Sequence, residues 1–195
     1  MHVTPLLLSK PLRSLMERYN KKVYLKLDCL QQSGSFKDRG MAHLCHHVYF
    51  TKNIRKLISS SGGNARLAVE TVAQQLQDME VHVIVPKTTK SNVVETLKQL
   101  NAKVTVFGEN WNEADTLARE MVQDQKDTTA YVSPYNDPML WEGHATVVSE
   151  IQQQLLLVEQ SNGVFHWSQN VKVKLGESNL PGARNISDKQ LVLIG

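Results

Sequence analysis

Segments with the two-residue period of β-strands alternate along this chain with segments that have the spacing of α-helices. The strand patterns lie at residues 23–27, 57–60, 81–85, 103–107 and 129–132, and the helix patterns at 36–50, 65–76, 91–100, 112–123 and from residue 140. Such alternation is typical of a parallel sheet, because parallel strands need a crossover that is usually a helix. We therefore predict an α/β fold in three layers, with helices on both faces of a parallel sheet.

The alternation ends near residue 152, where Gln152, Gln153 and Gln154 open a polar and irregular stretch. Residues 171–175 and 191–194 could form strands, but no convincing helix period lies between them. We therefore place one internal boundary near residue 152 and treat residues 153–195 as a divergent tail.

The composition is that of a globular chain of 195 residues, with 41% hydrophobic and 21% charged residues. The net charge of +3 is spread along the sequence without a basic run interleaved with aromatics, so we do not expect a nucleic-acid partner. The sequence has no stretch of 18 apolar residues, so we expect no membrane-spanning segment. Two cysteines, Cys29 and Cys45, fit a reducing compartment, and the expected location is the cytoplasm.

The first candidate loop, at residues 31–40, reads QQSGSFKDRG and follows the first strand pattern. Its glycine-serine turn leads into a helix whose first turn carries Lys37. A helix N-terminus has free amides and a partial positive charge, which disfavours a protonated amine. Lys37 could therefore have a lowered pKa and act as a nucleophile toward a carbonyl group. The alternative is an exposed lysine, with Asp38 and Arg39 pairing locally.

The second candidate loop, at residues 59–65, reads SSSGGNA and lies between a strand pattern and a helix pattern. Small residues let the backbone come close to a ligand, and successive amides at a helix start can bind an anion such as a carboxylate. The alternative is a tight turn in which Asn64 caps the helix.

Together, SGSFKDRG at residues 33–40 and SSGGNA at residues 60–65 resemble the fold-type II enzymes that use pyridoxal 5'-phosphate (PLP). The resemblance implies a tryptophan synthase beta-like fold in which Lys37 binds PLP covalently. It implies that Phe36 stacks beside the lysine and that Asn64 hydrogen-bonds the ring hydroxyl of the cofactor. The residues implied to hold the substrate carboxylate are Ser61, Gly62, Gly63, Asn64 and Ala65.

Three further segments are similar to the L-serine dehydratase and L-threonine deaminase group: HVTPL at 2–6, VPKTT at 85–89 and YNDPMLWEGHA at 135–145. This resemblance implies α,β-elimination, which converts L-serine to pyruvate and ammonia and L-threonine to 2-oxobutanoate. Residues 36–41 also look like threonine synthase, which uses a phosphorylated substrate. A third hypothesis is a non-catalytic isoform that binds or modulates a full-length subunit, and a homodimer is also implied.

The resemblance covers residues 2–152 and implies four parts. They are the N-terminal part of a large PLP domain (1–40), a small domain (41–135), a return helix of the large domain (136–152) and the divergent tail (153–195). The glycine-rich loop with which the family binds the cofactor phosphate is not found in the tail. We therefore expect a truncated chain with an incomplete large domain, inactive alone. Arg66 also departs from the family, which usually has a small residue there.

His43, His46 and His47 share a spacing that can bind a transition metal on one helix. No acidic residue or cysteine lies at a matching position, so we predict a partly exposed helix face and no metal site.

Overall fold

A computed structural model describes residues 2–20, 22–61 and 63–160. Gly62, one of the predicted carboxylate-binding residues, lies outside the described residues. So do the possible strands at 171–175 and 191–194 and all of the predicted tail beyond residue 160.

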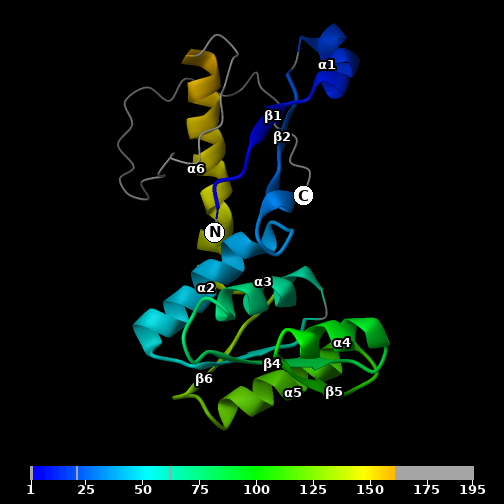
Figure 1. The fold of residues 1–195 in the computed structure, drawn as a ribbon, viewed down its shortest axis with the longest axis vertical. Helices are drawn as coiled ribbons and strands as arrows, with labels where there is room; N and C mark the ends of the chain where they lie inside the picture. Colours follow the sequence, from blue (N-terminus) through cyan, green and yellow to red (C-terminus); the bar gives the residue numbers. More distant parts are fainter. Residues whose placement is uncertain (1, 21, 62, 161–195) are drawn as a thin grey trace. The chain divides into compact units, whose positions relative to one another are not determined.

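The described chain divides into two compact units (Figure 1). The contiguous unit runs from Gln31 to Thr146, and the discontinuous unit combines His2–Leu30 with the described residues from Val147 on. The domain boundaries predicted at residues 40, 135 and 152 stay a prediction.

A parallel four-stranded sheet forms the centre of the contiguous unit. Its strands are β3 (Lys56–Ser59), β4 (Glu80–Val85), β5 (Lys103–Val106) and β6 (Thr129–Tyr131). Their order in the sheet is β5-β4-β3-β6, and every neighbouring pair is parallel. The predicted strands at 57–60, 81–85, 103–107 and 129–132 are these four strands.

Helices cover both faces of this sheet. They are α2 (Lys37–Lys52), α3 (Asn64–Ala73), α4 (Ser91–Gln99) and α5 (Trp111–Gln123). In Figure 1, α2 and α3 lie on one side of the sheet and α5 on the other. This arrangement confirms the predicted three-layer α/β fold.

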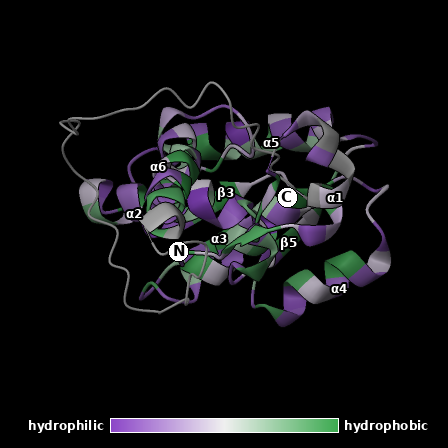
Figure 2. Cartoon of the chain, turned by 90° about the horizontal axis from the view of Figure 1, so that it is seen from above, coloured by the Kyte–Doolittle hydropathy of each residue, from purple (hydrophilic) through white to green (hydrophobic). Residues whose placement is uncertain are grey.

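Alternating side chains of the strands supply two separate cores, as the strand period requires. Val83 and Val85 of β4 belong to the larger core with α2 and α3, whereas Ile84 packs with Ala114 and Ala118 of α5. Helix α4 shows the matching pattern, since its buried Leu97 faces the larger core. Its green hydrophobic and purple hydrophilic residues are both visible in Figure 2.

The discontinuous unit contains an antiparallel strand pair, β1 (Leu6–Leu8) with β2 (Tyr24–Lys26). Its remaining elements are α1 (Lys10–Met16), the 3-10 turns η1 (Glu17–Tyr19) and η2 (Asp28–Leu30), and the part of α6 (Pro138–Gln160) beyond Thr146. The strand pattern at 23–27 predicted β2, but β1 and α1 were not predicted. Leu6, Tyr24 and Ile151 form the apolar core of this unit.

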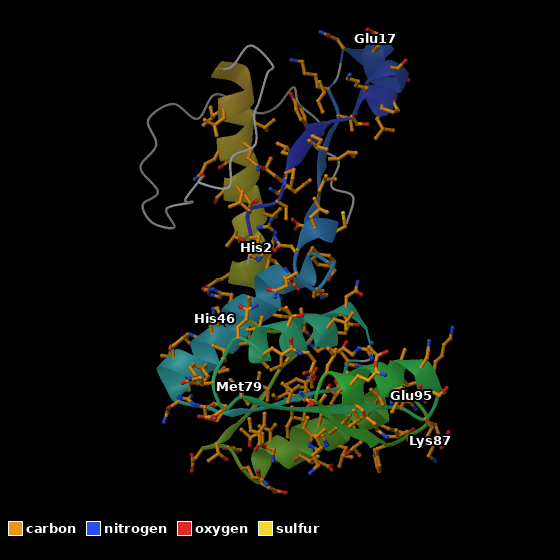
Figure 3. All side chains as sticks on the ribbon, in the orientation of Figure 1. His2, Glu17, His46, Met79, Lys87 and Glu95 are labelled. Carbon is orange, nitrogen blue, oxygen red and sulfur yellow. The ribbon has the colours of Figure 1, made fainter. Side chains whose placement is uncertain are left out.

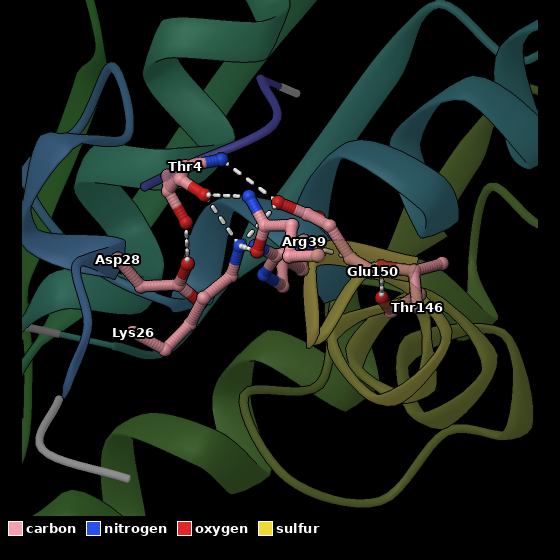
Figure 4. A network of polar contacts seen from close by, with 8 residues as sticks. Thr4, Lys26, Asp28, Arg39, Thr146 and Glu150 are labelled. Atoms are coloured by element: carbon pink, nitrogen blue, oxygen red, sulfur yellow. Dashed lines mark hydrogen bonds and ion pairs between the residues drawn. The ribbon is translucent and has the colours of Figure 1, made fainter. Parts of the chain in front are cut away.

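A buried polar network also holds the discontinuous unit together (Figure 4). The Lys26 ammonium lies 2.5 Å from Glu150 Oε1 and donates to the Thr4 carbonyl at 2.5 Å and to Gln154 Oε1 at 2.8 Å. The Thr4 amide donates to the same Glu150 oxygen at 2.8 Å, and the Thr4 hydroxyl donates to Asp28 at 2.6 Å. This network ties the two chain segments of the unit to each other.

In the contiguous unit, α2 and the start of α6 make a close contact at two glycines. A Cβ atom on Gly143 would lie 2.4 Å from the Arg39 carbonyl oxygen and 2.8 Å from the Gly40 Cα. A Cβ atom on Gly40 would lie 2.6 Å from Leu140. Glycine at both positions therefore permits this helix contact.

The surface carries the predicted histidine face. His43 and His46 are exposed on α2, and Figure 3 labels His46 there. His43 lies 3.4 Å from Glu142, and His46 packs edge-on against Phe50. Within residues 2–20, 22–61 and 63–160, no group of three or more metal-binding side chains is assembled. No helix in these same ranges is long and apolar enough to cross a membrane.

Glu70 of α3 gives the contiguous unit a pH-dependent stability. Its side chain is buried, and burial raises the pKa of Glu70 to about 7, although the nearby Arg66 acts in the opposite direction. The folded state therefore binds this proton more tightly than the unfolded chain. Protonated Glu70 therefore contributes its full stabilisation to the folded state below the ordinary carboxyl pKa. This contribution to the free energy of unfolding is lost as the pH rises through about 7.

We expect Glu70→Gln to raise the free energy of unfolding at pH 8 by about 2 to 3 kcal/mol relative to the wild type. At pH 4 the two proteins should have similar stability, because Glu70 is then protonated. Urea unfolding at both pH values measures this difference. Glu95→Gln, at an exposed position of α4, is the control and should leave the pH dependence unchanged. Equal pH dependence in wild type and Glu70→Gln would contradict the assignment.

Candidate functional site

The loop before α2 is locked onto the first turn of the helix by Asp38. The Ser33 amide donates to Asp38 Oδ2 at 2.8 Å, and the Ser33 hydroxyl donates to Asp38 Oδ1. Gly34 has a positive φ of 81°, which favours glycine, and its amide closes a turn on the Gln31 carbonyl at 2.8 Å. The glycine and serine residues of this loop therefore form the turn that precedes Lys37 at the start of α2.

Lys37 is the first residue of α2, and its side chain is half-buried. The ammonium donates to the Pro134 carbonyl at 2.8 Å and lies 5.3 Å from the ring centres of Phe36 and Tyr135. Burial lowers the pKa of Lys37, in the direction predicted from sequence. Among the described residues no carboxylate forms a salt bridge with Lys37, so its only partners there are the Pro134 carbonyl and the two aromatic rings.

The second loop connects β3 to α3. The Ser61 hydroxyl accepts from the Gly63 amide at 3.3 Å, and Asn64 is the first residue of α3. Asn64 is exposed and is not the helix cap, a role that falls to Gly63. A Cβ atom on Gly63 would meet nothing within 4 Å, so the backbone is open there to a ligand, while Ala65 is buried.

Sheet topology brings the two loops to the same edge. The β3–α3 loop begins where β3 ends, and Pro134, which accepts from Lys37, follows the end of β6. These two strands are parallel neighbours, with Ile58 opposite Tyr131. Ligands of open parallel sheets bind outside the carboxyl ends of the strands, which is where both loops lie.

The segment that follows β6 also belongs to this site, and it was not predicted as part of the site from the sequence. Tyr135 is largely exposed, faces the Lys37 ammonium and packs edge-on against Trp111, with ring centres 5.8 Å apart. Trp111 is itself 38% exposed. The position of Tyr135 just after a predicted strand was the available signal.

Arg66, which departs from the family pattern, lies away from the site, whereas His144 lies beside Phe36. Arg66 is buried, and its Nη1 donates to the Val93 carbonyl at 3.3 Å, so its side chain packs toward α4. The His144 ring lies 5.4 Å from the Phe36 ring, where it supports the aromatic side of Lys37.

Comparison with known proteins agrees with this geometry. Residues 1–167 match the family described as pyridoxal-phosphate dependent enzyme, which is well over half of the chain. The chain belongs to this PLP-dependent enzyme family. The resemblance proposed from the two loops is thereby confirmed, and PLP is the cofactor of this family.

Relatives within the PLP-dependent family carry the names expected from the sequence. The chain is 37% identical over 156 residues to an L-serine dehydratase of Dictyostelium discoideum, covering 78% of this chain and 44% of the relative. It is also 37% identical over 154 residues to the L-serine dehydratase/L-threonine deaminase of Homo sapiens, covering 77% and 46%. The chain spans less than half the length of these relatives.

A solved structure supports the same fold. The crystal structure of a fungal L-serine ammonia-lyase from Rhizomucor miehei matches with a TM-score of 0.68 and 32% identity. The match covers 79% of this chain and 47% of that enzyme. The chain thus shares the fold of the matched part of that enzyme.

The residues at this edge fit the family's cofactor. A half-buried lysine with a lowered pKa can supply the neutral amine that covalent attachment to an aldehyde requires. Phe36 is 43% exposed beside that amine and can face an aromatic ring. Open space at Gly63 allows a ligand to reach the loop amides.

Proposed function

We propose that this chain carries the lysine-bearing part of a PLP-dependent ammonia-lyase that acts on L-serine, and by the same route on L-threonine. The reaction is an α,β-elimination that yields pyruvate or 2-oxobutanoate with ammonia. The observation that carries this proposal is the half-buried Lys37 amine, which has no carboxylate partner among the described residues and lies at the same sheet edge as the β3–α3 loop.

PLP, when bound, withdraws electrons from the substrate Cα and so makes its proton acidic. The chain's own groups have separate tasks. The Nζ of Lys37 would hold the cofactor covalently and, as a free amine, would act as the general base that takes the proton from the substrate Cα. Burial keeps a larger fraction of this amine neutral, which both tasks need.

The other site residues bind and orient. We assign the substrate carboxylate to the loop that contains Ser61, Gly63 and Ala65, because the backbone is open at Gly63. Asn64, exposed at the start of α3, would hydrogen-bond the ring hydroxyl of the cofactor. Phe36 would stack against the cofactor ring.

We expect Lys37→Ala to abolish covalent capture of PLP. The purified chain is incubated with PLP, reduced with borohydride and digested, and the modified lysine is located by mass spectrometry. Wild type should carry the label at Lys37, whereas Lys37→Ala should fall to background. Lys52→Ala is the matched control, since Lys52 lies on the same helix but is exposed. Labelling spread over surface lysines, or unchanged in Lys37→Ala, would contradict the proposal.

The same assay distinguishes the substrate classes. An amino acid that binds in the site displaces Lys37 from the cofactor and should protect the lysine from reduction. Protection by L-serine and L-threonine supports the ammonia-lyase proposal. Protection by O-phosphohomoserine alone would instead favour a threonine synthase-like enzyme.

A further inference from the structure

A second polar cluster lies next to the site, built around the carboxylate of Asp115 on α5. Asp115 Oδ1 accepts from the Ser60 hydroxyl at 2.6 Å and from the Tyr131 hydroxyl. Asp115 Oδ2 accepts from Arg119 Nε at 2.7 Å. We call these four residues, Ser60, Asp115, Arg119 and Tyr131, the Asp115 clamp.

The Asp115 clamp joins the two segments that form the site. Ser60 is fully buried and directly precedes Ser61, at the start of the β3–α3 loop. Tyr131 is the last residue of β6, from which the chain runs to Pro134, the acceptor for Lys37. Helix α5 thus holds both segments from one face of the sheet through one carboxylate.

Hydrogen bonds favour the ionised form of this carboxylate. Burial acts to raise the pKa of Asp115, but hydrogen bonds from Ser60, Tyr131 and Arg119 outweigh it, so the pKa lies below its usual value. The Arg119 guanidinium also lies 4.2 Å from the Tyr131 ring centre, which fixes the phenol in place.

We propose that Asp115 is a positioning residue of this site: it holds the β3–α3 loop and the segment after β6 in the spacing that the cofactor and the substrate carboxylate require. The proposal rests on the proposed function for its chemical meaning. Asp115, Arg119 and Tyr131 were not singled out from the sequence, and no residue of the clamp needs to touch substrate or cofactor to act in this way.

A charged carboxylate is needed because three donors meet its two oxygens. Asparagine has nearly the same shape, but it offers one oxygen and places an amide group, itself a donor, against at least one of the three. Asp115→Asn therefore removes the charge that strengthens the hydrogen bonds from Ser60 and Tyr131, and it turns an amide donor toward Arg119, whose side chain is 52% exposed. The loss should appear first as local opening of the segments that the clamp holds.

Hydrogen exchange followed by mass spectrometry tests the clamp. In Asp115→Asn we expect exchange to quicken about tenfold or more in two peptides, one spanning the end of β3 with the start of α3 and one following β6. Peptides from β4 and α4 should be unchanged. Asp127→Asn, at an exposed position after α5, is the matched control. Val104→Ala on β5 lowers global stability without touching the clamp and should not produce this selective pattern.

Covalent capture of PLP supplies the readout that a purely structural role would not move. We expect Asp115→Asn to raise the PLP concentration for half-maximal labelling of Lys37 about tenfold or more, with Tyr131→Phe intermediate because it removes one donor. Unchanged exchange in both peptides overturns the clamp. Faster exchange with unchanged labelling overturns its positioning role. Absence of labelling in wild type would instead contradict the proposed function, and the exchange pattern would still decide the clamp.

Discussion

Replacing Lys26 by methionine is expected to lower the free energy of unfolding of the discontinuous unit by about 3 to 5 kcal/mol. Lys26 and Glu150 form an ion pair of 2.5 Å, with side chains only 1% and 4% exposed. Methionine fills a similar volume but leaves the Glu150 carboxylate buried without its cation, and such an uncompensated charge is strongly destabilising. Urea unfolding at neutral pH, followed by circular dichroism, measures the loss.

Lys87→Met is the matched control, because Lys87 and Glu109 are also 2.5 Å apart but largely exposed. Water screens this surface pair, so its removal should be hard to detect. The double variant Lys26→Met with Glu150→Leu should recover most of the lost stability, since it removes both charges of the pair and leaves neither one buried without the other. Similar losses at Lys26 and Lys87, or no recovery in the double variant, would show that the buried pair does not behave as described.

Gly143→Ala is expected to destabilise the contiguous unit by about 3 kcal/mol. The new Cβ would lie 2.4 Å from the Arg39 carbonyl oxygen, 2.7 Å from the His43 Cβ and 2.8 Å from the Gly40 Cα. Two of these atoms belong to the backbone of α2, so no side-chain rotation can relieve the overlap and the helices must separate. Urea unfolding of the variant measures the loss.

Gly63→Ala is the stability control for this substitution, because its φ of −113° suits alanine and its Cβ would meet nothing within 4 Å. Its stability should change by no more than about 0.5 kcal/mol. Since Lys37 begins α2, a shift of this helix in Gly143→Ala should also weaken labelling of Lys37 by PLP. Equal stability of the Gly143→Ala and Gly63→Ala proteins would mean that α2 and α6 do not depend on this close contact.

Much of the contiguous unit could be predicted from sequence, because its strands and helices carry their own periodic patterns. The predicted helix at 36–50 is α2, which runs to Lys52 and ends at Asn53 in a left-handed conformation. In contrast, Leu6–Leu8 has no alternation, and it becomes a strand only because β2 offers it hydrogen-bonding partners. Pairing of this kind depends on tertiary structure that a local pattern does not contain.

The candidate site divides in the same way. Lys37 and the β3–α3 loop could be predicted because each belongs to a motif of consecutive residues. The Pro134 carbonyl that accepts from Lys37 could not, since a backbone oxygen has no sequence signal and comes close only through the pairing of β6 with β3. Asp115 was hidden for a related reason, because its partners come from three different elements.

The discontinuous unit has a consequence for the order of events during synthesis. All contacts of the contiguous unit lie between Gln31 and Thr146, whereas Lys26 must wait for Glu150 before its charge can be neutralised. Bringing Lys26 and Glu150 together costs less conformational entropy once the chain between them is already compact. On the ribosome, the sheet with both site loops can therefore form first, while Lys26 stays without its ion-pair partner until the part of α6 that carries Glu150 emerges.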